Sequence, residues 1–373
     1  EPAPAGRQPV IGIDATFEPP PGLAAAIEAA KRAQDTGLKA IPELIQPMDG
    51  ACPRLARILR SAAIRTSLES YERQDAESVR QQALLKREAF WSNLCLLAAG
   101  VISGLILAVS AGALVSLAVG PLAPLSATLA DETVKSRVIL ALGLLTLALG
   151  AFAAYFAYVA RDQGRIARWQ TCRGEAEAAR LEVFSTVASG AAAAGKDVAL
   201  FGFAVVVTHL LEDQRTWLGA RAKRHRESSE MTTRMGALAS AFAFIGGSGA
   251  VIASQTGGSG AVWIVLVGVV GSAIGAFAAN REAVNRDRAN AERYDKTRMA
   301  MDAFAARVDG VAAKIAAGQP EALNAFTKTI ADLLSAENKQ WLDGTAQANA
   351  AIDKLDEQLG QLGKPKGADV AAN

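Results

Sequence analysis

The chain has 373 residues, of which 51% are hydrophobic and only 20% charged, a balance that is typical of a membrane protein. Its net charge of +2 gives no indication of nucleic-acid binding. Three widely spaced cysteines suit neither a disulfide framework nor a metal cluster, so we expect the soluble parts in a reducing compartment.

The N-terminal segment indicates a small α/β piece. Residues 9–45 predict a strand, a proline-rich loop, a helix and a second strand. One such unit cannot bury both faces of a sheet, so residues 1–62 are interpreted as a linker or a partial α/β domain. The first residue is Glu1 and no signal peptide follows, so we expect the natural protein to extend further. A nucleotide-sensing domain or partner protein is one candidate for that part, although no residue here indicates a ligand.

Long uncharged stretches decide the class of protein. They cover 91–130, 138–160 and 235–280. About 20 apolar residues cross a bilayer core as a helix. The first stretch predicts one long helix ended by Pro121 and Pro124, the second one span, and the third two spans separated by the turn "SQTGGSG". The four expected spans are 91–120, 138–160, 235–254 and 261–280.

Two further helices are expected outside the spans. The apolar run 198–211 contains His209 and is too short to cross a bilayer, so it predicts a packed or interfacial helix. A C-terminal helix at about 320–360 carries an apolar face, which predicts either the core of a helical bundle or an oligomer seam; we favour the bundle. That face holds Leu323, Phe326, Ile330, Leu333, Leu334 and Trp341.

The placement of lysine and arginine predicts the orientation in the membrane. Five of these residues lie in 63–90, five in 161–180, six in 212–234 and six in 281–300. The connection 121–137 has only two, and the turn 255–260 has none. Because positive charge collects on the cytoplasmic side, both termini and the central segment are expected in the cytoplasm. The chain is expected to cross the inner membrane of the cell several times.

A short echo suggests an internal repeat. The hexapeptides "RWQTCR" (168–173) and "RYDKTR" (293–298) begin and end with arginine and each follows an apolar stretch. We therefore predict an all-α membrane protein of two tandem two-span hairpins with long cytoplasmic helices, beside the N-terminal α/β remnant. The expected units are 63–196 and 197–345, followed by a helix end and disordered tail at 346–373. Two unrelated hairpins remain the alternative.

One stretch resembles a known family. "LEDQRTW" (211–217) precedes the second pair of spans and is similar to the entry of SLATT domains, through Asp213, Gln214, Arg215 and Trp217. "FTKTIADLLSAENKQW" (326–341) resembles the closing helix of that family, with Glu337 four residues before Trp341. The stretch 71–91 resembles a second SLATT variety that is often paired with it.

The resemblance covers about residues 63–345 and implies a function. SLATT proteins (SMODS and SLOG-associating two-transmembrane effectors) are membrane effectors of prokaryotic conflict systems, thought to form pores when a sensor is triggered. The resemblance therefore implies a homo-oligomeric pore-forming effector in antiphage defence.

The residues themselves indicate no enzyme chemistry. "GAAAAGKD" (190–197) nearly fits a P-loop, but Asp197 stands where a magnesium-binding hydroxyl is needed. His209 and His225 with scattered cysteines do not build a metal site. Glu212 and Asp213 lie among arginines and are interpreted as salt-bridge partners. We expect no catalytic, cofactor or metal site.

Glycine spacing within the spans predicts helix packing. Gly100 with Gly104, and Gly271 with Gly275, have GxxxG spacing and are expected at helix contacts or an oligomer interface. No span contains Asp, Glu, Lys, Arg or His, which disfavours a coupled transporter. The predicted function is an oligomeric pore in the lipid bilayer; a constitutive channel or transporter, and a non-conducting anchor for an N-terminal sensor or enzyme, remain alternatives.

Overall fold

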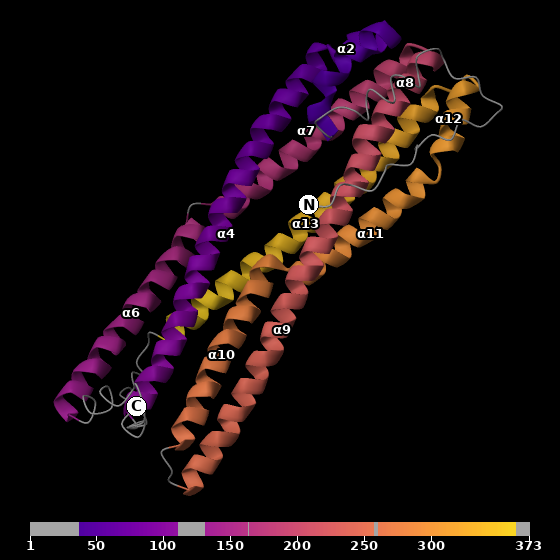
Figure 1. Ribbon diagram of the computed structural model, residues 1–373. Coiled ribbons are helices and arrows are strands. Elements are labelled where there is room, and N and C mark those ends of the chain that lie inside the picture. The colour runs from indigo at the N-terminus through magenta and orange to yellow at the C-terminus, as the bar shows by residue number, and fades with distance from the viewer. Residues whose placement is uncertain (1–36, 111–130, 163, 257–259, 363–373) are drawn as a thin grey trace, which may run out of the picture. The chain divides into compact units, whose positions relative to one another are not determined.

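The computed structural model describes residues 37–110, 131–162, 164–256 and 260–362, and every regular element within these ranges is a helix (Figure 1). The prediction of an all-α protein is thus confirmed for this part of the chain. The expected first strand and most of the α/β remnant lie outside the described residues, as do Pro121, Pro124 and the tail 363–373.

The expected second strand is wrong. Leu38–Ile45 forms the end of the short 3₁₀ helix η1 (Gly37–Ala40) and the start of helix α2 (Ile41–Ala51). Leu38, Ile41, Leu44 and Met48 are all buried, and their spacing of three to four residues is that of one helix face. Pro42 fits because it lies in the first turn of α2, where its missing N–H is not needed.

The chain divides into two compact units. The first, called here the helical unit, takes the described residues of Glu1–Arg80, Ala167–His225 and Ala289–Gly344; the second, the apolar unit, takes those of Gln81–Ile166, Arg226–Arg288 and Thr345–Asn373. Besides η1 and α2, the elements of the helical unit are α3 (Pro53–Leu59), the first part of α4 (Ala62–Ser110), most of α7 (Arg165–Ala193), α8 (Lys196–Val206), the π-helix η3 (Val207–Glu212), the first part of α9 (Asp213–Thr256), most of α11 (Asp287–Ala305), α12 (Val308–Ala316) and the first part of α13 (Glu321–Leu362).

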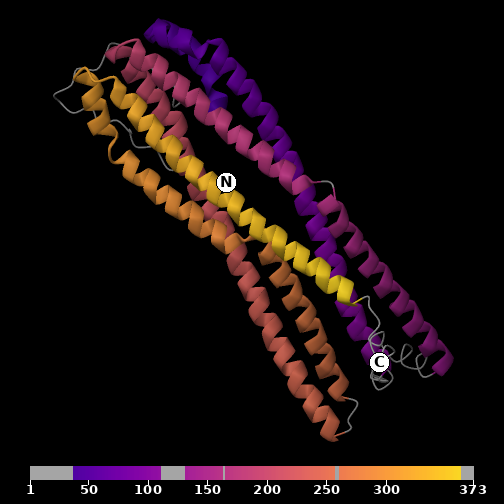
Figure 2. The ribbon, with the colours of Figure 1, turned by 180° about the vertical axis from the view of Figure 1, so that it is seen from behind.

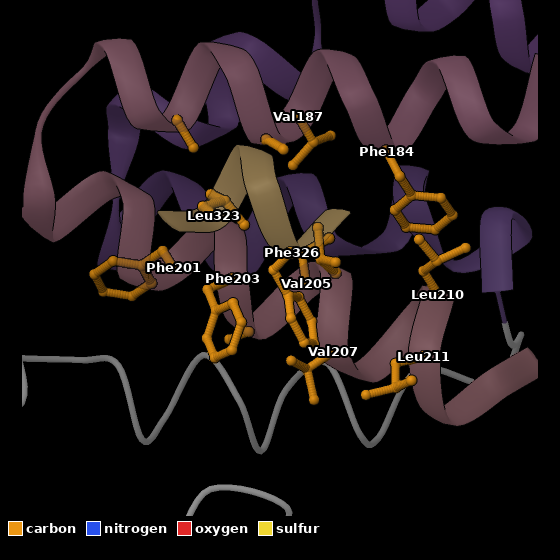
Figure 3. Packing of buried hydrophobic residues seen from close by; sticks show 14 of the residues in the cluster. Phe184, Val187, Phe201, Phe203, Val205, Val207, Leu210, Leu211, Leu323 and Phe326 are labelled. Carbon is orange, nitrogen blue, oxygen red and sulfur yellow. The ribbon is translucent and has the colours of Figure 1, made fainter. Parts of the chain in front are cut away.

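The core of the helical unit is built around α8 and η3 (Figure 3). The segment 198–211 is apolar on all sides, and such a helix is stable only when neighbours surround it. Phe203 of α8 packs edge-on against Phe326 of α13, with ring centroids 5.3 Å apart. His209 is buried in the same segment. The prediction of a packed helix is confirmed, and the interfacial alternative is excluded.

Helix α13 presents its apolar face to this core. Leu323 and Ile330 are fully buried, and Phe326 and Leu334 are nearly so. The predicted C-terminal helix is therefore present, and its apolar face belongs to the bundle core rather than to an oligomer seam.

The apolar unit contains the helices that hold the long uncharged stretches. These are the second part of α4, α6 (Glu132–Asp162), the second part of α9, and α10 (Gly260–Asn285). Three helical segments are long and apolar enough to cross a membrane: Ala62–Ser110, Glu132–Val159 and Ile264–Ala316. They overlap the first, second and fourth expected spans, and residues 111–120 of the first lie outside the described part. The third expected span, 235–254, lies within α9 and is not among them; the side chains of 249–254 are outside the described part.

Candidate functional site

The candidate site is the set of apolar helices, which lie side by side in the order α6, α4, α10, α9 (Figures 1 and 2). Helices α6 and α4 are joined by a hydrogen bond that Ser92 Oγ donates to the carbonyl oxygen of Ala153, at 3.1 Å. The remaining neighbours meet through glycine. This order places one helix of each expected hairpin, α4 and α10, at the centre of the row.

Gly100 and Gly104 form the contact between α4 and α10. A Cβ added to Gly100 would lie 2.8 Å from the Cβ of Ala273. A Cβ on Gly104 would lie 2.9 Å from Leu266 Cδ1 and 3.1 Å from Val269 Cγ1. Both glycines are therefore needed for the backbones to approach, and their partner is a helix of the same chain.

The contact between α10 and α9 is tighter still. A Cβ on Gly271 would lie 2.6 Å from the Cβ of Phe242, and a Cβ on Gly246 would lie 2.1 Å from the Cα of Gly268. Gly275 is in ordinary contact, 3.4 Å from the Cβ of Ala239. The four predicted packing glycines thus all lie at helix contacts within one chain; a role in an oligomer stays a prediction.

Two glycines of α6 behave differently. A Cβ on Gly143 or on Gly150 would have nothing within 4 Å, so neither glycine lies at a close helix contact within this chain.

The outward surface of these helices is apolar and broad. Large side chains exposed on α6 and α9 include Leu140, Leu144, Leu147, Phe152, Leu238, Phe244 and Ile245. In water an exposed apolar area of this extent marks an interface or a membrane contact. Trp91, Tyr155 and Tyr158, near the span ends, are exposed as well, as expected for aromatic residues at a lipid–water boundary.

Buried polar contacts hold the charged ends of the apolar unit. The guanidinium of Arg165 pairs with the carboxylate of Glu88, which is only 7% exposed. Ser228 Oγ of α9 donates to Asp287 Oδ2 at 2.5 Å, and Arg281 donates to the same hydroxyl at 3.3 Å. Each contact joins the helix that enters the apolar stretch to the segment that leaves it.

In the helical unit, the residues that resemble the SLATT entry form one polar cluster. Gln214 Nε2 donates to Asp213 Oδ2 at 3.1 Å. Arg215 Nε donates to Asp302 Oδ1 of α11 at 2.5 Å, and its guanidinium pairs with Glu212 at 3.2 Å. Glu212 is thus a salt-bridge partner, as predicted.

Trp217 stands at the centre of a cation–π group. Its ring lies 5.2 Å from the guanidinium carbon of Arg221 and 5.5 Å from that of Arg173. On another side it meets the ring of Tyr294 edge-on at 5.6 Å. Arg173 and Tyr294 belong to the two hexapeptides of the sequence echo, so Trp217 lies between them.

Glu337 and Trp341 of α13 contact the same two hexapeptides. Arg293 Nε donates to Glu337 Oε1 at 2.9 Å, and both side chains are 13% exposed. The ring of Trp341 meets that of Trp169 edge-on at 4.8 Å. The closing helix is therefore fixed to α7 through one hexapeptide and to α11 through the other.

A buried arginine lies near this cluster. Desolvation, and then the charge of Arg173, lower the pKa of Arg180 to about 10. Glu177 pairs with both arginines, at 2.7 Å to Arg173. These groups form a compensated ion network rather than an acid–base centre. In the described part of the chain, no three His, Cys, Asp or Glu side chains are grouped so that they could hold a metal ion.

Sequence reasoning missed the strongest sign of the repeat. The heptapeptide "ALGAFAA" (148–154) of α6 recurs as "AIGAFAA" (273–279) in α10, at the 125-residue distance that separates the two hexapeptides. Gly143 and Gly268 stand at the same distance. Both helices end shortly afterwards beside a residue in the left-handed conformation, Gly164 (φ 58°) and Arg286 (φ 49°). A search for identical spacing inside the spans would have found this signal.

Comparison of the chain with protein-family models, with curated proteins and with solved structures finds no match. A functional assignment therefore rests on the residues of this chain and on the arrangement of its helices.

Proposed function

We propose that this protein is an oligomeric pore-forming effector of the inner membrane, built from two tandem SLATT-like hairpins. In this proposal it disrupts the membrane in a prokaryotic conflict or antiphage defence system when a sensor triggers it. The observation that carries the proposal is the row of four apolar helical segments. Glycines bring α4 close to α10 and α10 close to α9, and polar contacts at the charged ends join the segments that enter and leave the row.

The interior of the spans favours a pore over a coupled transporter. Their hydroxyl groups donate to backbone carbonyls one turn earlier: Ser103 to Ala99 at 2.8 Å, and Thr146 to Leu142 at 2.9 Å. These side chains therefore offer no free donor and no charge to a passing ion. A pathway lined in this way would be wide or gated by dewetting, with weak ion selectivity.

The helical unit supplies a place where a signal could enter. Its SLATT-like residues fix α9, α11 and α13 to one another through Arg215–Asp302 and Arg293–Glu337. Helices α4 and α9 each begin in this unit and continue without interruption into the apolar unit. A sensor bound to the helical unit would act on the ends of the same helices that form the spans.

The proposal is tested by producing the protein in bacterial cells from a tightly controlled promoter. We expect loss of membrane potential and entry of small impermeant dyes soon after induction, before growth stops. The Gly246→Leu variant, which cannot keep the α9–α10 contact, should lose both effects. If cells die with tight membranes, the pore is refuted and an activity of another part of the protein must be responsible; if they grow normally with the protein inserted, the non-conducting anchor is favoured.

A further inference from the structure

The repeated heptapeptide has neighbours on two sides in α10. On one side of α10, Gly268 and Gly271 pack on α9. On the opposite side, Ala273, with Leu266 and Val269, packs on the glycine face of α4. Because α6 carries nearly the same sequence, its two sides can be compared with these position by position.

In α6 one of the two corresponding sides is open. The side that corresponds to the α9 contact meets α4, through Ala153. The residues that correspond to Leu266, Val269 and Ala273 are Ala141, Leu144 and Ala148, 125 positions earlier, and all three are exposed. Leu144 is 59% exposed. This surface, called here the α6 edge, has the composition of a helix contact that is occupied in α10.

The other end of the row has a matching surface. Helix α4 turns its Ser92 side to α6 and its glycine side to α10. At 3.6 residues per turn, Gly100 and Gly104 lie about 80° and about 120° round from Ser92, so the two sides are about 100° apart. Helix α9 packs on α10 with Ala239 and Gly246. The surface about 100° further round in the same sense holds Ser240, Phe244 and Gly247, all exposed, and is called here the α9 edge.

The α9 edge is shaped for a helix. Phe244 is 77% exposed, and a Cβ on Gly247 would have nothing within 4 Å. The α6 edge has one alanine on each side of Leu144, and neither edge carries a charge. A large side chain opposite small ones is the pattern by which Gly104 receives Leu266 and Val269 between α4 and α10.

We propose that the α9 edge of one copy packs on the α6 edge of the next copy, repeating the α4–α10 contact that joins the two hairpins inside each chain. The contact is head-to-tail, so each copy can add another, and the row closes into a ring where the rotation between neighbouring copies allows it. This inference rests on the proposed oligomer and names its interface. Inside the chain the order of spans is α6, α4, α10, α9, and the same order simply continues into the neighbour.

Disulfide trapping tests the interface in membranes. Ala148 corresponds to Ala273, which packs on Gly100. Gly100 lies 29 residues after Tyr71 in α4, and Gly247 lies 30 residues after Trp217 in α9. With the two helices aligned at Tyr71 and Trp217, Gly247 is the α9-edge residue nearest the level of Gly100. The probe is a protein with Ala148→Cys and Gly247→Cys, oxidised in native membranes with copper phenanthroline. A disulfide requires Cα atoms within about 7 Å, and α4 and α10 lie between these positions in one chain. A cross-link therefore reports neighbouring copies.

We expect the double variant to give a ladder of dimers and higher multiples, and each single variant only monomer. When the two single variants are produced together with different tags, the product should stop at a dimer that carries both tags. The matched control is Leu147→Cys with Gly247→Cys, because Leu147 is 71% exposed and lies next to Ala148 but about 100° round the helix. It should remain mostly monomer.

Three results would overturn the interface. Monomer alone in the double variant means that lipid covers both edges. Dimers of Ala148→Cys by itself mean that two α6 edges meet symmetrically. Equal cross-linking of the Leu147→Cys control means unspecific collision. Because trapping measures proximity and not conductance, a ladder in cells with tight membranes upholds the interface and refutes the pore, whereas leaky membranes without a ladder refute only this interface.

Discussion

Gly246 and Gly268 are in direct backbone contact: a Cβ added to Gly246 would lie 2.1 Å from the Cα of Gly268. No side chain intervenes between α9 and α10 at this point, so the two helices can separate only by losing the contacts along their whole crossing. The next residue, Gly247, has open space where its Cβ would be. Gly246 and Gly247 therefore allow a crowded glycine to be compared with an open one at the next position.

Gly246→Ala should destabilise the apolar unit, and Gly247→Ala should not. Forcing one methyl group into the α9–α10 contact costs roughly 1–3 kcal/mol, as overpacking does elsewhere. The same methyl at Gly247 meets nothing and gains helix propensity, about 0.5–1 kcal/mol. Unfolding of the purified protein in mixed detergent micelles measures both. Equal effects of the two changes would mean that helix propensity alone decides and that the close contact is absent.

Glu337→Ala should destabilise the helical unit strongly. Its side chain and that of Arg293 are each only 13% exposed. Removing one member of a fully buried pair costs about 3–5 kcal/mol because the other charge remains unpaired, so we expect a loss of up to that size. Replacing both residues with leucine should recover much of the loss. Thermal unfolding, followed by circular dichroism, reports the change.

The control for this pair is Glu230→Ala. Glu230 faces Arg234 at 3.8 Å, with side chains 60% and 77% exposed, and solvent screening leaves such a pair little net stability. If Glu230→Ala lowers the unfolding temperature as much as Glu337→Ala, burial of the Arg293–Glu337 pair is not the cause.

The thiol of Cys172 should react slowly and only at high pH. Burial raises its pKa, and the nearby carboxylates of Glu77 and Glu175 raise it further, so less thiolate exists at a given pH than for an ordinary thiol. Mass-spectrometric measurement of iodoacetamide labelling from pH 7 upward should show a late rise for Cys172. Glu77→Gln should move that rise to lower pH; an unchanged profile in this variant would rule out the electrostatic contribution.

The orientation is tested with cysteines at two exposed residues, Ser136 and Ala178. In a cysteine-free background, a membrane-impermeant thiol reagent applied to intact cells should label Ser136→Cys, which precedes the second span on its expected outer side. Ala178→Cys should be labelled only after permeabilisation, because it follows the arginine-rich exit of that span. Labelling of Ala178→Cys in intact cells would reverse the orientation.

The long uncharged stretches and the buried run 198–211 could be predicted from the sequence because burial of uniformly apolar helices follows from composition alone. The strand at 38–45 was wrong because short apolar runs suit either structure, although Leu38, Ile41 and Leu44 already had helical spacing. Pro42 is compatible with both readings.

The sequence does not predict which helices pack against one another. GxxxG spacing predicts that a helix approaches Gly100 and Gly104, but it does not say that this helix is α10 of the other hairpin. Likewise, nothing in the spacing of Trp341 indicates Trp169 as its neighbour, 172 residues away. Such contacts depend on how all the helices of a unit pack together, because each helix face that contacts one neighbour is closed to the others.

Release of solutes from vesicles tests the central claim most directly. Purified protein, reconstituted at a high protein-to-lipid ratio into anionic vesicles that hold a small self-quenching dye and a large dextran, should release the dye. Vesicles with the Gly246→Leu variant should stay tight at equal insertion, because the α9–α10 contact is lost. Vesicles that retain the dye although the unaltered protein is inserted and resists carbonate extraction would contradict the assignment of this protein as a pore.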